Sequence, residues 1–157
     1  MSFKELKNLF SVTEVELVYR NKRKPSDRPV ITNSKIAYDL FVQSWDLNKI
    51  ELLEQFKIIL LDRKNSCIGI SDISTGGVSY CVVDPKIVFS TALKAMASGI
   101  ILAHNHPSGN TKPSGSDEQL TKKLAEAGEL LEIKVLDHLV ITSDSYTSFA
   151  DEGLIPF

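Results

Sequence analysis

The stretch ILAHNHPSGNTKPSGSDEQL, residues 101–120, contains an apolar run, two histidines separated by one residue, and a loop rich in proline, glycine and serine. The apolar run predicts a short buried strand at residues 100–103, and the prolines and glycines that follow indicate a loop. Leucines and alanines then recur at helical spacing, which predicts a helix over residues 116–131. A buried strand that leads through a loop into an amphipathic helix is typical of a fold that mixes strands and helices.

The rest of the chain shows a similar, irregular alternation of strand-like and helix-like segments. An apolar run at 56–62, a polar turn and a second run at 67–73 predict a β-hairpin. Together the segments predict an α/β fold of the α+β type, in which a curved, mixed and largely antiparallel sheet packs against helices. The remaining strands are expected at 13–21, 80–84 and 133–142, and the remaining helices at 34–45, 47–55 and 85–98.

Length and composition are those of a single globular domain. The chain has 157 residues, of which 43% are hydrophobic and 24% are charged. The net charge of −2 provides no overall attraction to nucleic acids or membranes, and no apolar stretch approaches the ~20 residues of a membrane span. The first residues lack the apolar core of a secretory signal, and Cys67 and Cys81 are too few for a disulfide framework. We therefore expect a cytoplasmic protein that does not bind membranes.

We expect residues 1–29 to form an N-terminal extension and residues 30–157 to form the main domain. In the extension, a strand-like segment precedes RNKRKPSDRP, residues 20–29, whose charges and prolines predict a basic arm. Such an arm is more often a solvated loop than a binding surface, but its charge is the local feature that favours contact with nucleic acid. Its basic residues are Arg20, Lys22, Arg23, Lys24 and Arg28.

His104 and His106 have the spacing of two metal ligands at the end of a strand. Side chains at positions i and i+2 of an extended segment point to the same side, and sites are common at the carboxyl ends of strands. Asp117, near the start of the expected helix, can return across the loop and complete a set of two imidazoles and one carboxylate. This set suits Zn²⁺ and leaves a fourth position for water, as in catalytic zinc sites.

Simpler roles for the same residues stay open at this stage. A His-x-His pattern on its own is more often a strand cap or an exposed pair than a metal site. Ser114 and Asp117 also match a helix capping box, with Ser114 as the N-cap residue. The combination of strand, loop, serine and aspartate in this order is more specific than any of its parts.

The pattern His104-x-His106-x7-Ser114-x-x-Asp117 resembles the JAMM motif of the JAB/MPN metallopeptidase family. The string HNHPSG that starts at His104, the proline before Ser114, and the downstream strings AGELLEIKVLDHLVI and SYTSFADEGLI resemble the RadC-like branch of that family. The resemblance covers roughly residues 30–155 and implies the cytidine-deaminase-like fold of JAB/MPN domains. Asn105 stands where the general JAMM pattern has Ser or Thr, as it does in RadC-like sequences. Full-length RadC proteins also have an N-terminal helical domain, for which this chain is too short.

The resemblance implies a zinc-dependent hydrolase of peptide or isopeptide bonds, with one Zn²⁺ per chain and a peptide or protein substrate. The metal-activated water needs a general base, which in the family is a glutamate upstream of the histidines. Glu54 is the best match, Glu51 is its rival, and either glutamate taken alone is an ordinary solvated charge. The resemblance further implies that the Ser114 hydroxyl donates to the developing oxyanion. Asp137 and His138 are either a support for the metal site or a structural pair, and we favour the structural role.

Two other classes of function compete with the hydrolase. One is a DNA-repair or DNA-processing accessory, the role attached to the RadC name, for which the basic arm is the local support. The other is a non-catalytic MPN scaffold, which the retained His104, His106, Ser114 and Asp117 disfavour.

Overall fold

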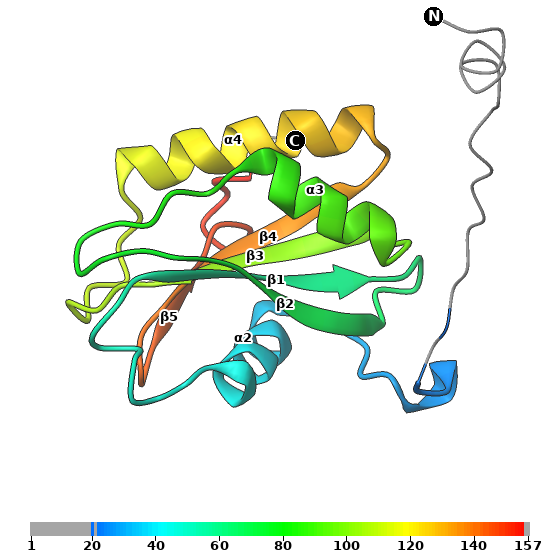
Figure 1. The fold of residues 1–157 in the computed structure, drawn as a ribbon, viewed down its shortest axis with the longest axis horizontal. Helices are drawn as coiled ribbons and strands as arrows, with labels where there is room; N and C mark the ends of the chain where they lie inside the picture. Colours follow the sequence, from blue (N-terminus) through cyan, green and yellow to red (C-terminus); the bar gives the residue numbers. More distant parts are fainter. Residues whose placement is uncertain (1–19, 21, 156–157) are drawn as a thin grey trace, which may run out of the picture.

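The computed structural model of the chain describes residue 20 and residues 22–155. The strand expected at 13–21 and the rest of the N-terminal extension before Arg20 lie outside the described residues. A five-stranded sheet has helix α2 on one face and helices α3 and α4 on the other (Figure 1). The helices are η1 (Pro25–Asp27), α2 (Ser34–Ser44), α3 (Pro85–Lys94) and α4 (Gly115–Leu130). The strands are β1 (Gln55–Leu61), β2 (Cys67–Thr75), β3 (Gly99–Asn105), β4 (Lys134–Ile141) and β5 (Tyr146–Ser148).

The sheet is mixed, with the strand order β2-β1-β3-β4-β5. β1 pairs antiparallel with both β2 and β3, and β4 pairs antiparallel with β5. β3 and β4 run parallel, and α4 connects them. The predicted hairpin and the largely antiparallel sheet are therefore confirmed. Because β3 and β4 are parallel, their carboxyl ends meet at one edge, which is where open α/β sheets place their sites.

Two apolar layers enclose the central strands, because alternate residues of a strand point to opposite faces. In β1, Ile58 and Leu60 pack with residues of α3 and α4, whereas Ile59 and Leu61 pack with residues of α2. β1 and β3 are buried on both faces, which explains why each is a continuous apolar run in the sequence. No helix among residues 20 and 22–155 is long and apolar enough to cross a membrane.

The three described α-helices begin within one residue of the expected positions 34, 85 and 116, but one helix ends earlier than expected. Asn33, Asp84 and Ser114 each accept a hydrogen bond from a backbone N–H of the first turn of their helix. α3 ends at Lys94 rather than at residue 98, because Met96 has a positive φ of 54° and the chain turns there toward β3.

Two further segments differ from the sequence expectation. Residues 47–53 form turns rather than the expected helix at 47–55, and Gln55 already begins β1. Residues 80–84 are an extended loop without a strand partner, rather than the expected strand. This loop nevertheless buries part of Cys81 and Val83 against the core that contains α3 and α4.

Candidate metal centre and its cavity

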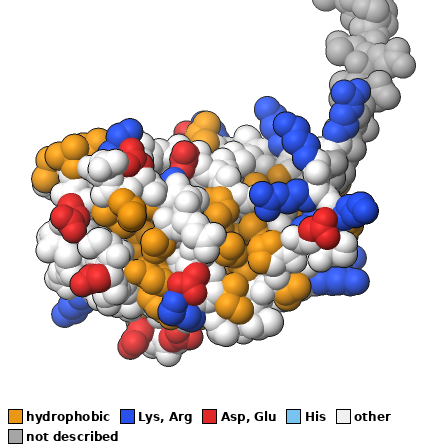
Figure 2. All heavy atoms as spheres, turned by 90° about the horizontal axis from the view of Figure 1, so that it is seen from below, with side chains coloured by type: hydrophobic (Ala, Val, Ile, Leu, Met, Phe, Trp, Pro, Cys, Tyr) orange, Lys and Arg blue, Asp and Glu red, His pale blue; other side chains and the backbone are white. Residues whose placement is uncertain are grey.

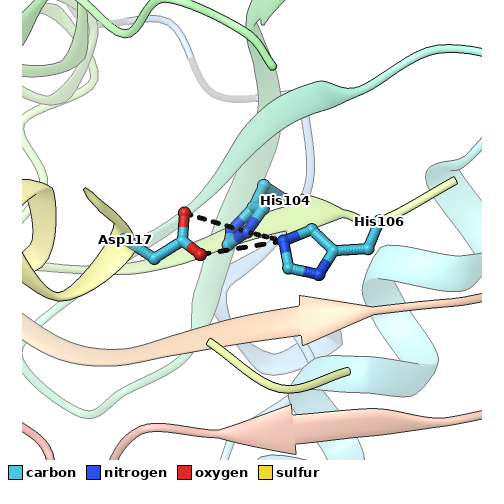
Figure 3. Close-up of side chains that lie close together, drawn as sticks. All are labelled: His104, His106 and Asp117. Atoms are coloured by element: carbon cyan, nitrogen blue, oxygen red, sulfur yellow. Dashed lines mark hydrogen bonds and ion pairs between the residues drawn. The ribbon is translucent and has the colours of Figure 1, made fainter. Parts of the chain in front are cut away.

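His104 and His106 lie at the carboxyl end of β3 and point to the same side (Figure 3). His104 is the penultimate residue of β3, has 2% of its surface exposed, and stacks on Phe56 of the neighbouring strand. His106 follows the strand, and its backbone N–H still donates to the carbonyl oxygen of Ile141 at the end of β4, 3.0 Å away. The chain therefore stays extended through both histidines, as their spacing predicted.

Asp117 reaches the histidines from the first turn of α4. Its Oδ1 is 3.3 Å from His104 Nε2, and its Oδ2 is 3.7 Å from His106 Nε2. The capping box is also present: Asp117 Oδ2 accepts from the Ser114 backbone N–H at 2.7 Å and from the Ser114 hydroxyl at 2.6 Å. The two roles considered from the sequence thus coexist in one carboxylate. The cap holds one oxygen in place, and the other faces His104.

The three side chains form a donor set that fits a divalent metal. One ligand atom from each of His104, His106 and Asp117 lies within 4.8 Å of the others. The Nε2 atoms of the two histidines are 2.9 Å apart. His106 Nδ1 lies 2.6 Å from the carbonyl oxygen of Asn110, which only accepts, so Nδ1 carries the proton and Nε2 presents its lone pair. If His104 Nε2 also presents a lone pair, the two lone pairs and the carboxylate oxygen of Asp117 repel each other unless a proton or a cation lies between them.

The pKa values of Asp117 and His106 are shifted by the close contact of their side chains. Burial acts to raise the pKa of Asp117, but hydrogen bonds from His104, His106 and Ser114, together with the charge of His104, outweigh it and hold the pKa well below its usual range. The hydrogen bond to Asp117 raises the pKa of His106, against the opposing effect of burial. The carboxylate is therefore ionised at neutral pH and available to a cation.

A cavity of about 940 Å³ opens over these residues. Its polar side is formed by the donor set and the loop that follows β3, and its apolar side by the loop at residues 76–84. Val78 and Tyr80 of that loop are exposed large hydrophobic residues that line the cavity. A cleft of this size that combines apolar walls with a few convergent polar groups is typical of a ligand site.

Glu51 and Glu54 both line the cavity, but their side chains have different partners. Glu54 is half-buried, its Oε1 accepts from the Cys81 backbone N–H at 3.3 Å, and burial raises its pKa against the opposing influence of His104. Glu51 is exposed, and its Oε1 accepts from the Ser143 hydroxyl at 3.0 Å. Glu54 is therefore the carboxylate whose pKa responds to the charges of the donor set.

Asn105 is a site residue whose role sequence reasoning missed. Its fully buried amide donates to the carbonyl oxygens of Ile50 at 2.6 Å and Leu53 at 2.8 Å, and its Oδ1 accepts from the Gln55 backbone N–H at 2.7 Å. These bonds tie the turn that carries Glu51 and Glu54 to the strand that carries the histidines. The sequence signal was an amide between two histidines, on the opposite side of an extended segment.

Asp137 and His138 divide between the two roles considered for them. Asp137 accepts from the Ser148 hydroxyl and from the backbone N–H groups of Ala150 and His138, which fastens β4 to β5 and the segment after it. This role is structural. His138 instead turns toward the candidate site, where its Nε2 lies 2.8 Å from His104 Nδ1. Burial lowers its pKa well below the usual value, so the ring is neutral at physiological pH.

The basic arm lies at the other end of the sheet. Arg28 pairs with Asp62, just beyond β1, at 3.1 Å, and the register of β1 and β3 places Leu61 opposite Gly99 and Phe56 opposite His104. Figure 2 shows Lys and Arg side chains gathered where the described chain begins. Binding of nucleic acid by this arm stays a prediction, and such binding would occur away from the candidate metal centre.

Comparison with known proteins agrees with this geometry. A family model described as a RadC-like JAB domain matches residues 31–154. The chain belongs to the RadC-like JAB domain family. The five-stranded mixed sheet with three flanking helices is consistent with the JAB fold, so the expected fold class is confirmed.

Three relatives illustrate the range of similarity. A UPF0758 protein of Flavobacterium johnsoniae is 46% identical over 101 residues, which are 64% of this chain and 44% of the relative. One from Symbiobacterium thermophilum is 46% identical over 103 residues, 66% of this chain and 44% of the relative. One from Trichlorobacter lovleyi is 40% identical over 124 residues, 79% of this chain and 53% of the relative. The chain thus spans about half the length of the curated relatives it matches.

Proposed function

We propose that this domain is a zinc-dependent hydrolase of peptide or isopeptide bonds, with one Zn²⁺ held by His104, His106 and Asp117. The observation that carries the proposal is the convergence of these three ligand atoms at the wall of a cavity that also contains Glu54. Two imidazoles and one carboxylate suit zinc, and three protein ligands leave a position for water. When bound, the metal would supply a water of lowered pKa and polarise the scissile carbonyl.

The remaining chemistry belongs to the side chains of the cavity. Glu54 is the proposed general base: its raised pKa and its neighbours His104 and His106 suit a group that takes a proton and later delivers it to the leaving amine. The Cys81 backbone N–H holds the Glu54 carboxylate in orientation. Ser114 lines the same cavity, and its hydroxyl is the proposed donor to the developing oxyanion. Its single proton points to Asp117 Oδ2 in this structure, so it would have to turn from Asp117 to the oxyanion during the reaction.

The apolar residues that line the cavity favour a substrate that has an apolar side chain near the bond to be cleaved. Val78 and Tyr80 are exposed and line the same cavity as the ligand set, so an extended peptide that carries an apolar side chain near the scissile bond would cover exposed apolar surface. A protein substrate with a flexible segment meets this requirement.

The test combines metal analysis with a screen for hydrolysis. Protein loaded with zinc and then desalted is expected to retain about one equivalent. A library of peptides and isopeptide-linked conjugates is then screened with wild type, Glu54→Gln, Asp117→Ala and the matched control Glu51→Gln. Glu54→Gln should keep zinc and lose hydrolysis, Asp117→Ala should lose both, and Glu51→Gln should keep both. A wild type that binds no zinc, or a Glu54→Gln protein with unchanged turnover, would overturn the proposal.

A further inference from the structure

A chain of three side chains leads from His104 to the carbonyl oxygen of Asp117. His104 Nδ1 lies 2.8 Å from His138 Nε2, and His138 Nδ1 lies 2.6 Å from Thr121 Oγ1. Thr121 Oγ1 in turn lies 2.7 Å from the backbone carbonyl oxygen of Asp117, one turn earlier in α4. The three side chains are at most 2% exposed, so water does not substitute for any of these contacts.

When each of the two buried rings carries a single proton, only one assignment of protons satisfies every contact in the chain. The carbonyl oxygen of Asp117 can only accept, so the single Thr121 hydroxyl proton points to it. Thr121 Oγ1 then accepts from His138, which places the single proton of the His138 ring on Nδ1 and leaves Nε2 as an acceptor. His138 Nε2 consequently accepts from His104 Nδ1–H, and the lone pair of His104 is left on Nε2. That atom is the one that faces His106 and Asp117.

Packing prevents the His138 ring from turning out of this chain. Phe149 stacks on the ring with centroids 4.8 Å apart, and Phe56 meets it edge-on at 5.5 Å. The two ring nitrogens of His138 therefore stay aimed at His104 and Thr121. Because the ring cannot rotate, a proton fixed on Nδ1 by Thr121 leaves Nε2 as a hydrogen-bond acceptor for His104.

We propose that Thr121 and His138 are positioning residues, which hold His104 in the tautomer that presents Nε2 to a metal. The proposal deepens the proposed function, since it concerns the same zinc site. It also links two ligands that come from different elements, because the chain begins on Asp117 of α4 and ends on His104 of β3. Metal-binding histidines are commonly oriented by a group on the other ring nitrogen, but here the orienting group is itself oriented by the helix that carries a second ligand.

The decisive variants differ by one hydroxyl group. Thr121→Val keeps the shape of the side chain and removes its oxygen, so the acceptor that stabilises a proton on His138 Nδ1 is lost. Thr121→Ser keeps the hydroxyl. Thr91→Val is the matched control, because the Thr91 hydroxyl donates to the carbonyl oxygen of Ile87 in the same way on α3, outside the candidate site.

Two readouts that need no substrate are measured. The first is the tautomer of each histidine in metal-free protein, from ¹⁵N chemical shifts of the imidazole nitrogens. The second is zinc affinity, from competition with a chromophoric chelator. In wild type, Thr121→Ser and Thr91→Val we expect His104 protonated on Nδ1 and zinc affinities within about threefold of each other. In Thr121→Val we expect a substantial population of the other His104 tautomer and zinc binding at least about tenfold weaker.

Either of two results would overturn the proposal. One is a Thr121→Val protein with unchanged tautomers and unchanged zinc affinity. The other is an equal loss of affinity in Thr121→Ser and Thr121→Val, which would assign the effect to packing rather than to the hydroxyl. Neither readout depends on turnover. A wild-type protein that binds zinc but hydrolyses nothing would therefore overturn the proposed activity and leave this test intact.

Discussion

The two histidines of the candidate metal centre are neighbours in the sequence and yet are held in different ways. His104 is buried in β3 and is oriented by His138 and Thr121, which lie far from it in the chain. His106 is partly exposed, with 18% of its side-chain surface accessible, and is oriented by the carbonyl oxygen of Asn110, four residues away in its own loop. The comparison shows that one ligand depends on the tertiary core and the other on local loop geometry. Changes near each histidine should therefore have separable effects.

The largest expected difference is in stability when each histidine is removed. His104→Ala leaves a buried void and an unpaired His138 Nε2, so we expect a loss of about 2–4 kcal/mol in the free energy of unfolding. His106→Ala removes a partly exposed ring held by a loop contact and should cost less, about 1 kcal/mol. Urea denaturation in the presence of a chelator measures both values. Both variants should lose zinc, and equal stabilities would contradict the comparison.

Asn105, which lies between the histidines, should separate metal binding from the proposed base. Asn105→Ala leaves two buried carbonyl oxygens and one N–H group without their partner, and we expect a loss of about 2 kcal/mol in stability. The turn that carries Glu54 is then no longer tied to β3, whereas the three metal ligands are unchanged. We expect zinc affinity close to wild type together with reduced hydrolysis of any substrate found. Weaker zinc binding in Asn105→Ala would show instead that Asn105 supports the metal ligands.

A pH titration should identify His106 as the histidine at which protons compete with zinc. Asp117 raises the pKa of His106, so its protonated form stabilises the metal-free fold at low pH, and this contribution disappears as the pH rises through that pKa. Zinc needs the neutral ring, so its affinity should fall by up to about tenfold for each pH unit below the raised pKa. Chelator competition between about pH 8 and about pH 5.5 tests this, with NMR of the His106 ring in metal-free protein as the check. A flat zinc affinity over this range would contradict the expectation.

The smallest effect is expected from the loop that orients His106. Gly109 has φ of 78° and follows the turn closed by its own N–H and the carbonyl oxygen of His106. Gly109→Ala meets no atom within 4 Å, so its cost is the backbone strain of about 1 kcal/mol, with zinc affinity a few-fold lower. Gly153→Ala is the matched control, since Gly153 has φ of 70°, equally open space, and no part in the site. A weaker zinc affinity in both variants would show that the effect does not arise in the loop.

Local sequence was sufficient for the elements whose signals lie within one turn or one strand. Helical patterns predicted the starts of three helices to within one residue, and the apolar runs predicted β1, β3 and β2, which is the antiparallel neighbour of β1. The spacing of His104 and His106 was enough to place both rings on one side, because the alternation of side chains along a strand needs no tertiary partner.

The sequence predictions of secondary structure were wrong where backbone groups form hydrogen bonds with residues distant in the chain. The helix expected at 47–55 does not continue, because Asn105 binds the carbonyl oxygens of Ile50 and Leu53 and the Glu54 N–H donates to Gly77. The strand expected at 80–84 has the right alternation, with Cys81 and Val83 packed inward, but the Cys81 N–H donates to the Glu54 carboxylate instead of to another strand. Propensity could not reveal either competition, since it describes only neighbours along the chain.

The same division applies to the candidate site. The primary structure by itself contains the ligand types and their order, His104, His106 and Asp117, and these indicate zinc. The partner of each ligand was decided by packing: His138 lies 34 residues from His104, and Thr121 lies 17 residues from His138. The tautomer of His104 depends on its hydrogen bond with His138, and only the folded core brings these two rings together. The tautomer is therefore a property of the tertiary structure.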